Sequence, residues 1–309
     1  MQPGYLLPVL AAALALQAAA PAQMSPSRPA ITGISHIAVY TSDPSAAAYY
    51  YTAVVGAVKL PDPENPQGVR YALSATQSIE VLPLPAGAGI VRLDHVAWRT
   101  SDAEAMRRYL AANGWKTPAR VQRGVDGSRW FQVLDPEANK VQFVQPPAHP
   151  APVDAPLAIG RHIIHVGYMV HNRALEDTFY RNLLGFRPYW WGGRNGQVNW
   201  VSQQCPDGHD WMEYMMTRGA AGLPADMTQH ELGVMDHFSI GVVSVPAVFK
   251  TLAAANRLGE HHDAAPKIGL DGKYQLNLYD PDGIRTEVMD FHATEKPCCS
   301  PFTAGDPSN

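Results

Sequence analysis

The chain has 309 residues with a formal net charge of -4, and 46% of the residues are hydrophobic. That length is enough for one large domain or two ordinary domains with hydrophobic cores. The small acidic net charge, without any run of basic residues, argues against a nucleic acid as the partner.

The first 23 residues have the features of an export signal. An apolar stretch, Leu6–Leu10, continues into alanine-rich sequence, and Ala20–Ala22 supplies the small residues that signal peptidase requires. The absence of Lys and Arg before this stretch is unusual for a signal, so a membrane anchor or a misassigned start is the alternative. We expect residues 1–23 to be a signal peptide and the mature protein to be periplasmic or secreted. No later run is long enough to span a bilayer, so we expect no membrane contact after the signal is removed.

Four similar units follow along the rest of the chain. Each begins with a short strand that contains a histidine, and each continues with a helical run and about three alternating strands. The four strands begin at Ile34-Ser35-His36, Leu93-Asp94-His95, Ile164-His165 and Met235-Asp236-His237. The second and fourth units keep the same spacing over more than fifteen residues, from Asp126-Gly127 to Gln142 and from Asp271-Gly272 to Glu287. Residues of the type that caps a helix precede all four helical runs: Asp43, Ser101 or Asp102, Asn172 and Ser244.

These patterns predict an α+β protein of four βαβββ units. We expect them to form two tandem modules, 31–146 and 161–293, because a proline-rich segment at 147–160 separates the second unit from the third. The tail, 294–309, has no pattern that we can assign.

Strand alternation predicts where the side chains point in the second module. His165 should share a face with Ile163 and Gly167, opposite Ile164 and Val166. The same rule places His237 on one face of its strand with Ser239 and Gly241. On the other two strands it groups Glu213 with Trp211 and Met215, and Glu287 with Arg285 and Met289. A sheet curled with the histidine face inward would enclose a cavity, which is the natural place for a ligand.

This order of residues resembles the vicinal-oxygen-chelate superfamily, which includes glyoxalases, bleomycin-resistance proteins and extradiol dioxygenases. The resemblance implies two curled mixed sheets and a metal bound by His165, Glu213, His237 and Glu287. Two imidazoles with one or two carboxylates suit one divalent ion of Fe, Mn, Co, Ni or Zn. Glu213 has an alternative role as a displaced base or a partner for an arginine. The first module has His36, Glu80, His95 and Gln142 in these places. We expect it to be degenerate because Gln142 lacks the carboxylate; the alternative is a metal site there too, since glutamine ligands occur in this family.

The resemblance implies an enzyme that acts on a small, oxygen-chelating substrate. The first interpretation is a glyoxalase- or epimerase-like lyase or isomerase, in which Glu213 or Glu287 is catalytic and moves a proton. The alternative is an extradiol Fe(II) dioxygenase with His165, His237 and Glu287 as the triad. The sequence departs from the extradiol pattern at two places. Asn277 stands where a tyrosine is expected, and residues 267–270 lack the expected acid–base histidine. The third interpretation is a non-catalytic binding or resistance protein. The substrate and the oligomeric state stay open.

Several further residues have two interpretations each. Tyr189–Gly193 and Trp200 are either core or the wall of a substrate pocket. His209 is either a proton-transfer group or an exposed side chain, and His261 and His262 are expected in solvent. One of the cysteines Cys298 and Cys299 could form a disulfide with Cys205, or all three could be free thiols.

Overall fold

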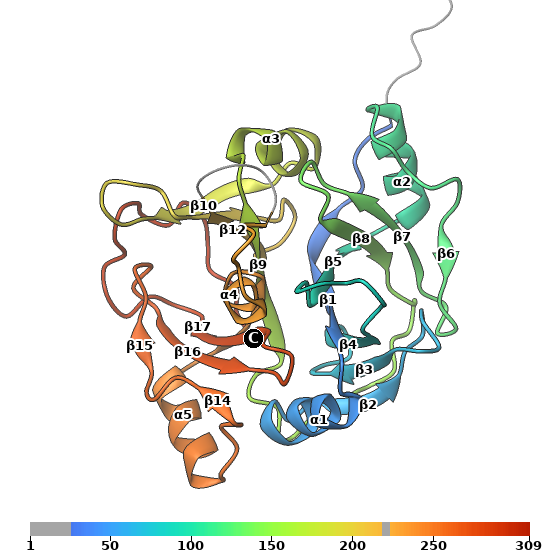
Figure 1. The fold of residues 1–309 in the computed structure, drawn as a ribbon. Helices are drawn as coiled ribbons and strands as arrows, with labels where there is room; N and C mark the ends of the chain where they lie inside the picture. Colours follow the sequence, from blue (N-terminus) through green and yellow to red (C-terminus); the bar gives the residue numbers. More distant parts are fainter. Residues whose placement is uncertain (1–25, 218–222) are drawn as a thin grey trace, which may run out of the picture.

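The computed structural model describes residues 26–217 and 223–309, which form two curled sheets that lie side by side (Figure 1). The predicted signal peptide lies outside these residues. Within the two described ranges, the longest apolar helices are too short to cross a membrane. The predicted α+β architecture of two tandem modules is confirmed.

The first sheet has eight strands in the order β2-β3-β4-β1-β5-β8-β7-β6. The central strand β1 runs parallel to β4 and antiparallel to β5, and β5 runs parallel to β8. The strands are β1 (Ile31–Thr41), β2 (Val58–Pro61), β3 (Val69–Ala72), β4 (Ser78–Pro83), β5 (Leu93–Thr100), β6 (Gln122–Arg123), β7 (Arg129–Leu134) and β8 (Lys140–Gln145). The helical segments are α1 (Pro44–Tyr49), which continues as η1 (Tyr50–Val54), and α2 (Ala103–Ala112).

The second sheet repeats this topology in the order β10-β11-β12-β9-β13-β17-β16-β14, with β15 paired to β16. Strands β9, β12, β13 and β17 correspond to β1, β4, β5 and β8. The strands are β9 (His162–Val170), β10 (Arg187–Gly192), β11 (Trp200–Gln204), β12 (Trp211–Met216), β13 (His237–Val242), β14 (His261–His262), β15 (Lys267–Ile268), β16 (Tyr274–Tyr279) and β17 (Arg285–Asp290). The helical segments are α3 (Arg173–Asp177), η2 (Thr178–Leu183), α4 (Gln229–Met235) and α5 (Val245–Ala254).

The four repeated helices begin at the predicted caps. Asp43, Asp102, Asn172 and Ser244 each accept hydrogen bonds from amides of the first turn. Asp102, and not Ser101, is the cap of α2. These side chains satisfy amides that have no partner within the helix, which fixes where each helix starts.

A bulge in β9 changes the predicted faces of two residues. Ser239 pairs with His165 and Ile240 pairs with Ile163, so Ile164 is an extra residue in the ladder. Ile163 therefore packs in the main core with Val166, whereas Ile164 packs near Trp211 and Met289. The predicted placement of Ile163 beside His165 and of Ile164 opposite it was wrong, because strict alternation does not hold across a bulge.

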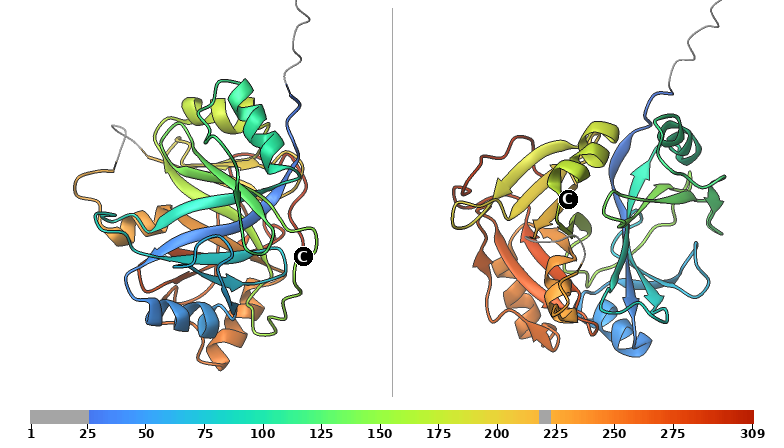
Figure 2. Two further views of the ribbon diagram at one scale, coloured as in Figure 1. Left: turned by 90° about the vertical axis from the view of Figure 1, so that its right-hand side faces the viewer. Right: turned by 45° about the horizontal axis from the view of Figure 1, so that its top comes forward.

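The two modules share one hydrophobic core. Trp98 of β5 packs edge-on against Phe186, which precedes β10, with ring centroids 4.9 Å apart. The buried amide of Gln77 bridges β1 and β9, since its Nε2 donates to the carbonyls of Ile34 and Ile163, both at 3.0 Å. The modules are therefore held against each other along β1 and β9; Figure 2 shows the two sheets in two further views.

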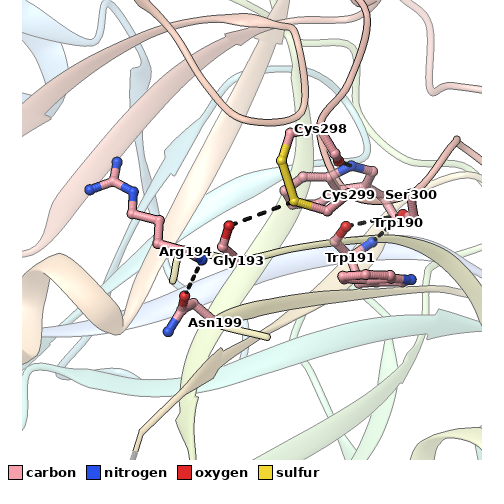
Figure 3. Close-up of a disulfide and its surroundings, with 8 residues drawn as sticks. All are labelled: Trp190, Trp191, Gly193, Arg194, Asn199, Cys298, Cys299 and Ser300. Carbon is pink, nitrogen blue, oxygen red and sulfur yellow. Dashed lines mark hydrogen bonds between the residues drawn. A yellow bond between two sulfur atoms is a disulfide. The ribbon is translucent and has the colours of Figure 1, made fainter. Parts of the chain in front are cut away.

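The tail folds back over the second module. Cys298 and Cys299 form a disulfide with each other, next to the end of β10 (Figure 3). Cys205 is buried in the main core with a free thiol. Both expectations for the tail cysteines were therefore wrong: they are neither linked to Cys205 nor free. Trp190 Nε1 donates to the carbonyl of Cys298 at 3.3 Å, and the backbone of Trp191 exchanges hydrogen bonds with the Ser300 hydroxyl.

Candidate metal centre

Three potential metal ligands meet on neighbouring strands of the second sheet. His165 lies on β9, His237 on β13 and Glu287 on β17, and these strands are adjacent. His165 Nε2 is 3.1 Å from His237 Nε2 and 3.2 Å from Glu287 Oε2. All three ligand atoms lie within 4.8 Å of one another, and all three residues are buried. A single ion can therefore contact all three side chains after small movements.

The environment of each imidazole directs Nε2 towards this point. His237 Nδ1 donates to the carbonyl of Met235 at 2.7 Å, so His237 Nε2 carries a free lone pair. Gly167 leaves room for this ring, because a Cβ there would lie 2.2 Å from His237 Cε1. The His165 ring stacks on Trp211 with centroids 4.7 Å apart. Burial lowers the pKa of both histidines, which keeps them in the neutral form that binds metal.

Glu287 supplies the negative charge of the cluster. Burial alone would raise the pKa of its carboxyl, but the charge of Arg285 and the hydrogen bond with His165 hold that pKa at about 2. Arg285 Nη1 lies 3.6 Å from Glu287 Oε1. The site therefore offers two neutral imidazoles and one carboxylate. This donor set fits a divalent transition-metal ion and leaves coordination positions free for other ligands.

Glu213 lies beside the cluster and not within it. Its Oε2 is 3.6 Å from His237 Nε2, and the residue falls outside the group of three converging ligands. Burial, followed by the negative charge of Glu287, raises the pKa of Glu213 to about 8. The four ligands predicted from the sequence thus appear as three converging candidate ligands and one neighbouring carboxyl with a raised pKa.

A cavity of about 230 Å³ opens above Glu213 and Glu287. Its wall contains Trp190, Trp200, Arg194, Asp271, Asn277 and Arg285, among others. The aromatic residues that the sequence left open between core and pocket wall differ in their surroundings. Trp190 and Trp200 line the cavity, Tyr189 is in the core and Trp191 is exposed. His209 is exposed and donates to the carbonyl of Gly305, and His261 and His262 are exposed on β14. None of these three histidines lines the cavity.

The first module also gathers His36, Glu80 and His95. His36 Nε2 lies 3.3 Å from His95 Nε2 and 3.4 Å from Glu80 Oε2. Gln142 has the strand position that Glu287 has in the second module, but it offers a neutral amide, and its Oε1 accepts a hydrogen bond from Gln132 at 2.9 Å. A buried guanidinium, that of Arg70, lies next to this cluster with Nη2 3.4 Å from His36 Nε2.

Three further residues contribute to these sites. Strand alternation predicted that Trp211 shares a face with Glu213 and that Arg285 shares a face with Glu287, but it assigned neither residue a role. Arg70 had no such signal. It reaches Glu80 only through the pairing of β3 with β4, and pairing register is not visible in local periodicity.

Comparisons with known proteins agree with this topology. The profile of the Glyoxalase/Bleomycin resistance protein/Dioxygenase superfamily matches residues 33–143. The first module is therefore a member of that superfamily, as the resemblance predicted, and the second module repeats its strand topology. A search of curated proteins found no significant match.

Solved structures of extradiol dioxygenases share the two-module fold. A catechol 2,3-dioxygenase is 16% identical, with 88% of this chain and 96% of that chain covered and a TM-score of 0.59. The 2,3-dioxygenase LapB from Pseudomonas sp. KL28 is 14% identical, with coverage of 89% and 97% and a TM-score of 0.63. Homoprotocatechuate 2,3-dioxygenase from Brevibacterium fuscum, in complex with 3,4-dihydroxyphenylacetate, is 16% identical, with coverage of 94% and 86% and a TM-score of 0.62. At these identities the likeness shows the fold.

Proposed function

We propose that the second module binds one divalent metal ion through His165, His237 and Glu287, and that the protein is an enzyme. The observation that carries this proposal is the convergence of two neutral imidazoles and one carboxylate below a cavity. A bound ion would act as a Lewis acid on the oxygen atoms of a small substrate. The cavity volume of about 230 Å³ suits a small molecule with two adjacent oxygens.

Glu213 is the proton-transfer group in this proposal. Its carboxyl lines the cavity, lies next to His237, and has a pKa raised to about 8 by burial and by Glu287. A group whose pKa is near the working pH gives and takes protons with similar ease. Glu213 would remove a proton from a carbon next to a substrate oxygen and return it elsewhere, and Arg285 would keep Glu287 ionised meanwhile.

The proposed reaction class is a proton-transfer reaction of the lyase or isomerase type. Among the described residues that line the cavity, the groups that titrate near neutral pH are carboxyls, Glu213 and Asp271, and none is a histidine or a tyrosine. Burial raises the pKa of Asp271 to about 7, so a second proton carrier lies on the same wall. Two carboxyls of this kind suit the movement of a proton between two positions of one substrate.

Extradiol ring cleavage is the second candidate, and the shared two-module fold of the dioxygenases favours it. The three-ligand cluster matches the two-histidine, one-carboxylate set used by non-haem iron oxygenases. In this chain Asn277 pairs with Glu287 across β16 and β17 and lines the cavity, in the place expected for a tyrosine. Glu213 would then have to accept the substrate proton.

Metal analysis tests the site itself. Protein purified without chelator should contain about one equivalent of a transition metal, and His237→Ala should lose it. His262→Ala, which removes an exposed histidine, is the matched control. Wild-type protein that binds none of Fe, Mn, Co, Ni or Zn after reloading would overturn the proposal.

A second measurement separates the two reactions. The metal-loaded protein is incubated in D₂O with a set of 2-hydroxycarbonyl compounds, and in parallel with catechols under an oxygen electrode. Deuterium incorporation without oxygen consumption supports the lyase or isomerase class. Oxygen consumption with a catechol supports ring cleavage and overturns the first candidate.

We also propose that the mature protein is exported. The apolar N-terminal segment and its small-residue cleavage pattern support export, and a disulfide such as Cys298–Cys299 persists in oxidising compartments. Cell fractionation and N-terminal sequencing should give an exported protein that starts near Gln23. An uncleaved chain in the cytoplasm would contradict this proposal.

A further inference from the structure

The guanidinium of Arg70 lies next to the His36, Glu80 and His95 cluster, which is the first module's counterpart of the candidate metal site. We propose that Arg70 is an internal cation that takes the place of a metal ion in the first module. We further propose that the residue at this strand position decides which of the two modules binds metal.

Arg70 contacts two members of the cluster, His36 and Glu80, and two further buried acids, Asp62 and Glu64. Its Nη2 lies 3.4 Å from His36 Nε2, 3.4 Å from Glu64 Oε1 and 3.7 Å from Glu80 Oε2. Its Nε lies 3.4 Å from Asp62 Oδ1. The side chain is only 9% exposed, so solvent does little to screen these charges. Arg70 thus places a positive charge among three buried carboxyls, as a bound metal ion would.

A metal ion and Arg70 are incompatible in this place. The guanidinium stays protonated under all conditions in which proteins fold, so it cannot yield its charge to an incoming ion. An ion bound by His36 and Glu80 would lie within a few ångströms of that charge, with little water between them. Repulsion at such short range in a buried site lowers the affinity by orders of magnitude.

The rest of the first cluster agrees with this interpretation. Gln142 stands at the position of Glu287 and brings no negative charge. Its Oε1 accepts from Gln132, and its Nε2 donates to Glu64 at 2.5 Å, so both ends of the amide are engaged in hydrogen bonds. The first module has therefore lost one carboxylate ligand and gained a permanent cation, and both changes oppose a divalent ion.

The matching position in the second module is Ser202. Arg70 pairs with Glu80 across β3 and β4, and Ser202 pairs with Glu213 across β11 and β12. Ser202 is buried, but its side chain is too short to reach the centre of the cluster. The two modules thus differ at one register position: a long cation in the first module and a small neutral residue in the second.

Exchange of these two residues tests the proposal with Co²⁺ as the probe. The first arm uses chelator-treated full-length His237→Ala protein, in which the second site is disabled, so its result does not depend on the proposed enzyme function. This background should bind less than about 0.1 equivalent of Co²⁺, whereas adding Arg70→Ser should create a site for about one equivalent. A further His95→Ala substitution should abolish the new site, and Arg108→Ser, which removes an exposed arginine, should not create one.

Two variants keep the test decisive. Arg70→Lys retains the charge and should bind no Co²⁺, which separates the effect of charge from the effect of volume. If Arg70→Ser does not fold, as judged by its circular dichroism, Arg70→Gln replaces it. In the second arm, Ser202→Arg in the wild-type background should reduce Co²⁺ affinity at least about 100-fold.

The visible spectrum of bound Co²⁺ and the shift in melting temperature on adding Co²⁺ give readouts that do not need a substrate. Co²⁺ binding by His237→Ala while Arg70 is intact would overturn the proposal. A folded Arg70→Ser or Arg70→Gln protein that gains no site would also overturn it, as would Ser202→Arg protein with unchanged affinity.

Discussion

The hydroxyl of Tyr51, in the η1 segment that continues the first helix, donates a hydrogen bond of 2.9 Å to Asp280, in the turn that precedes the last strand. Tyr180 makes the equivalent contact with Asp135 at 3.2 Å. In both cases the tyrosine belongs to the first helix of one module and the aspartate to the last turn of the other. The two modules are therefore joined by a pair of matching buried contacts, related by the internal repeat.

Tyr51→Phe should lower the free energy of unfolding by about 1–2 kcal/mol, because it leaves the buried carboxyl of Asp280 without this donor. Chemical denaturation followed by tryptophan fluorescence measures the change. Tyr49→Phe, which alters an exposed ring two residues away, is the control and should have no effect. If Tyr51→Phe is as stable as wild type, the contact contributes nothing to module docking.

Glu287→Gln copies the first module's residue into the second site. Loss of the carboxylate charge should weaken metal binding at least about 100-fold while the fold is retained. Metal content after dialysis against a buffered ion measures the effect. Glu295→Gln, at an exposed position near the tail, is the matched control. Unchanged metal content in Glu287→Gln would remove this residue from the site.

Glu213→Gln separates a metal ligand from a proton carrier. Because Glu213 lies outside the three-ligand cluster, we expect metal affinity to stay within about 10-fold of wild type while turnover falls at least about 100-fold. Parallel metal titration and activity measurements give both values. A loss of affinity as large as that of Glu287→Gln would instead make Glu213 the fourth ligand.

Glu176 should make stability depend on pH. Burial, together with the negative charge of Asp135, raises the pKa of this fully buried carboxyl to about 9, compared with about 4.5 in the unfolded chain. The unfolded state therefore releases a proton that the folded state keeps. The contribution to stability is fully present below pH about 4.5 and is lost progressively as the pH rises to about 9.

Glu176→Gln replaces this titratable carboxyl with a neutral amide, so the variant lacks this source of pH dependence. The unfolding free energy of this variant, relative to wild type, should rise steadily from pH 5 to pH 9 and reach a difference of about 1–3 kcal/mol at pH 9. Its melting temperature should rise relative to wild type over the same range. Glu104→Gln is the control, since Glu104 lies on the surface of α2. A difference that is constant over this range would show that Glu176 is ionised in the folded protein.

The cysteines should be distinguishable by alkylation. Without reductant, native protein should take up no iodoacetamide, because Cys205 is buried and Cys298 is linked to Cys299. Denaturation should expose Cys205 alone, and reduction should then label all three. Mass spectrometry of the tail peptide should show a mass about 2 Da below the reduced form. A peptide that joins Cys205 to the tail would contradict the structure.

Much of the fold could be predicted from the sequence because it rests on local patterns that occur four times. Side chains that cap helices satisfy nearby amides, so Asp43 and Asn172 marked helix starts without any tertiary information. The repeated spacing also identified His165, His237 and Glu287, since each stands at a fixed place in its own unit. The gathering of these three side chains followed from the order of their strands.

Tertiary structure decided what the site can do. The sequence could not separate Glu213 from the three converging residues, because that depends on how the sheet curls. It gave no sign of the bulge at Ile164, which puts Ile163 and Ile164 on faces other than those predicted. It also gave no sign of Arg70, which reaches Glu80 only through strand pairing. The sequence by itself determined the repeat, the modules and the types of ligand, because local backbone preferences and spacing encode them. Register, curvature and charge placement were decided only by the fold, because they arise between segments that are distant in the chain.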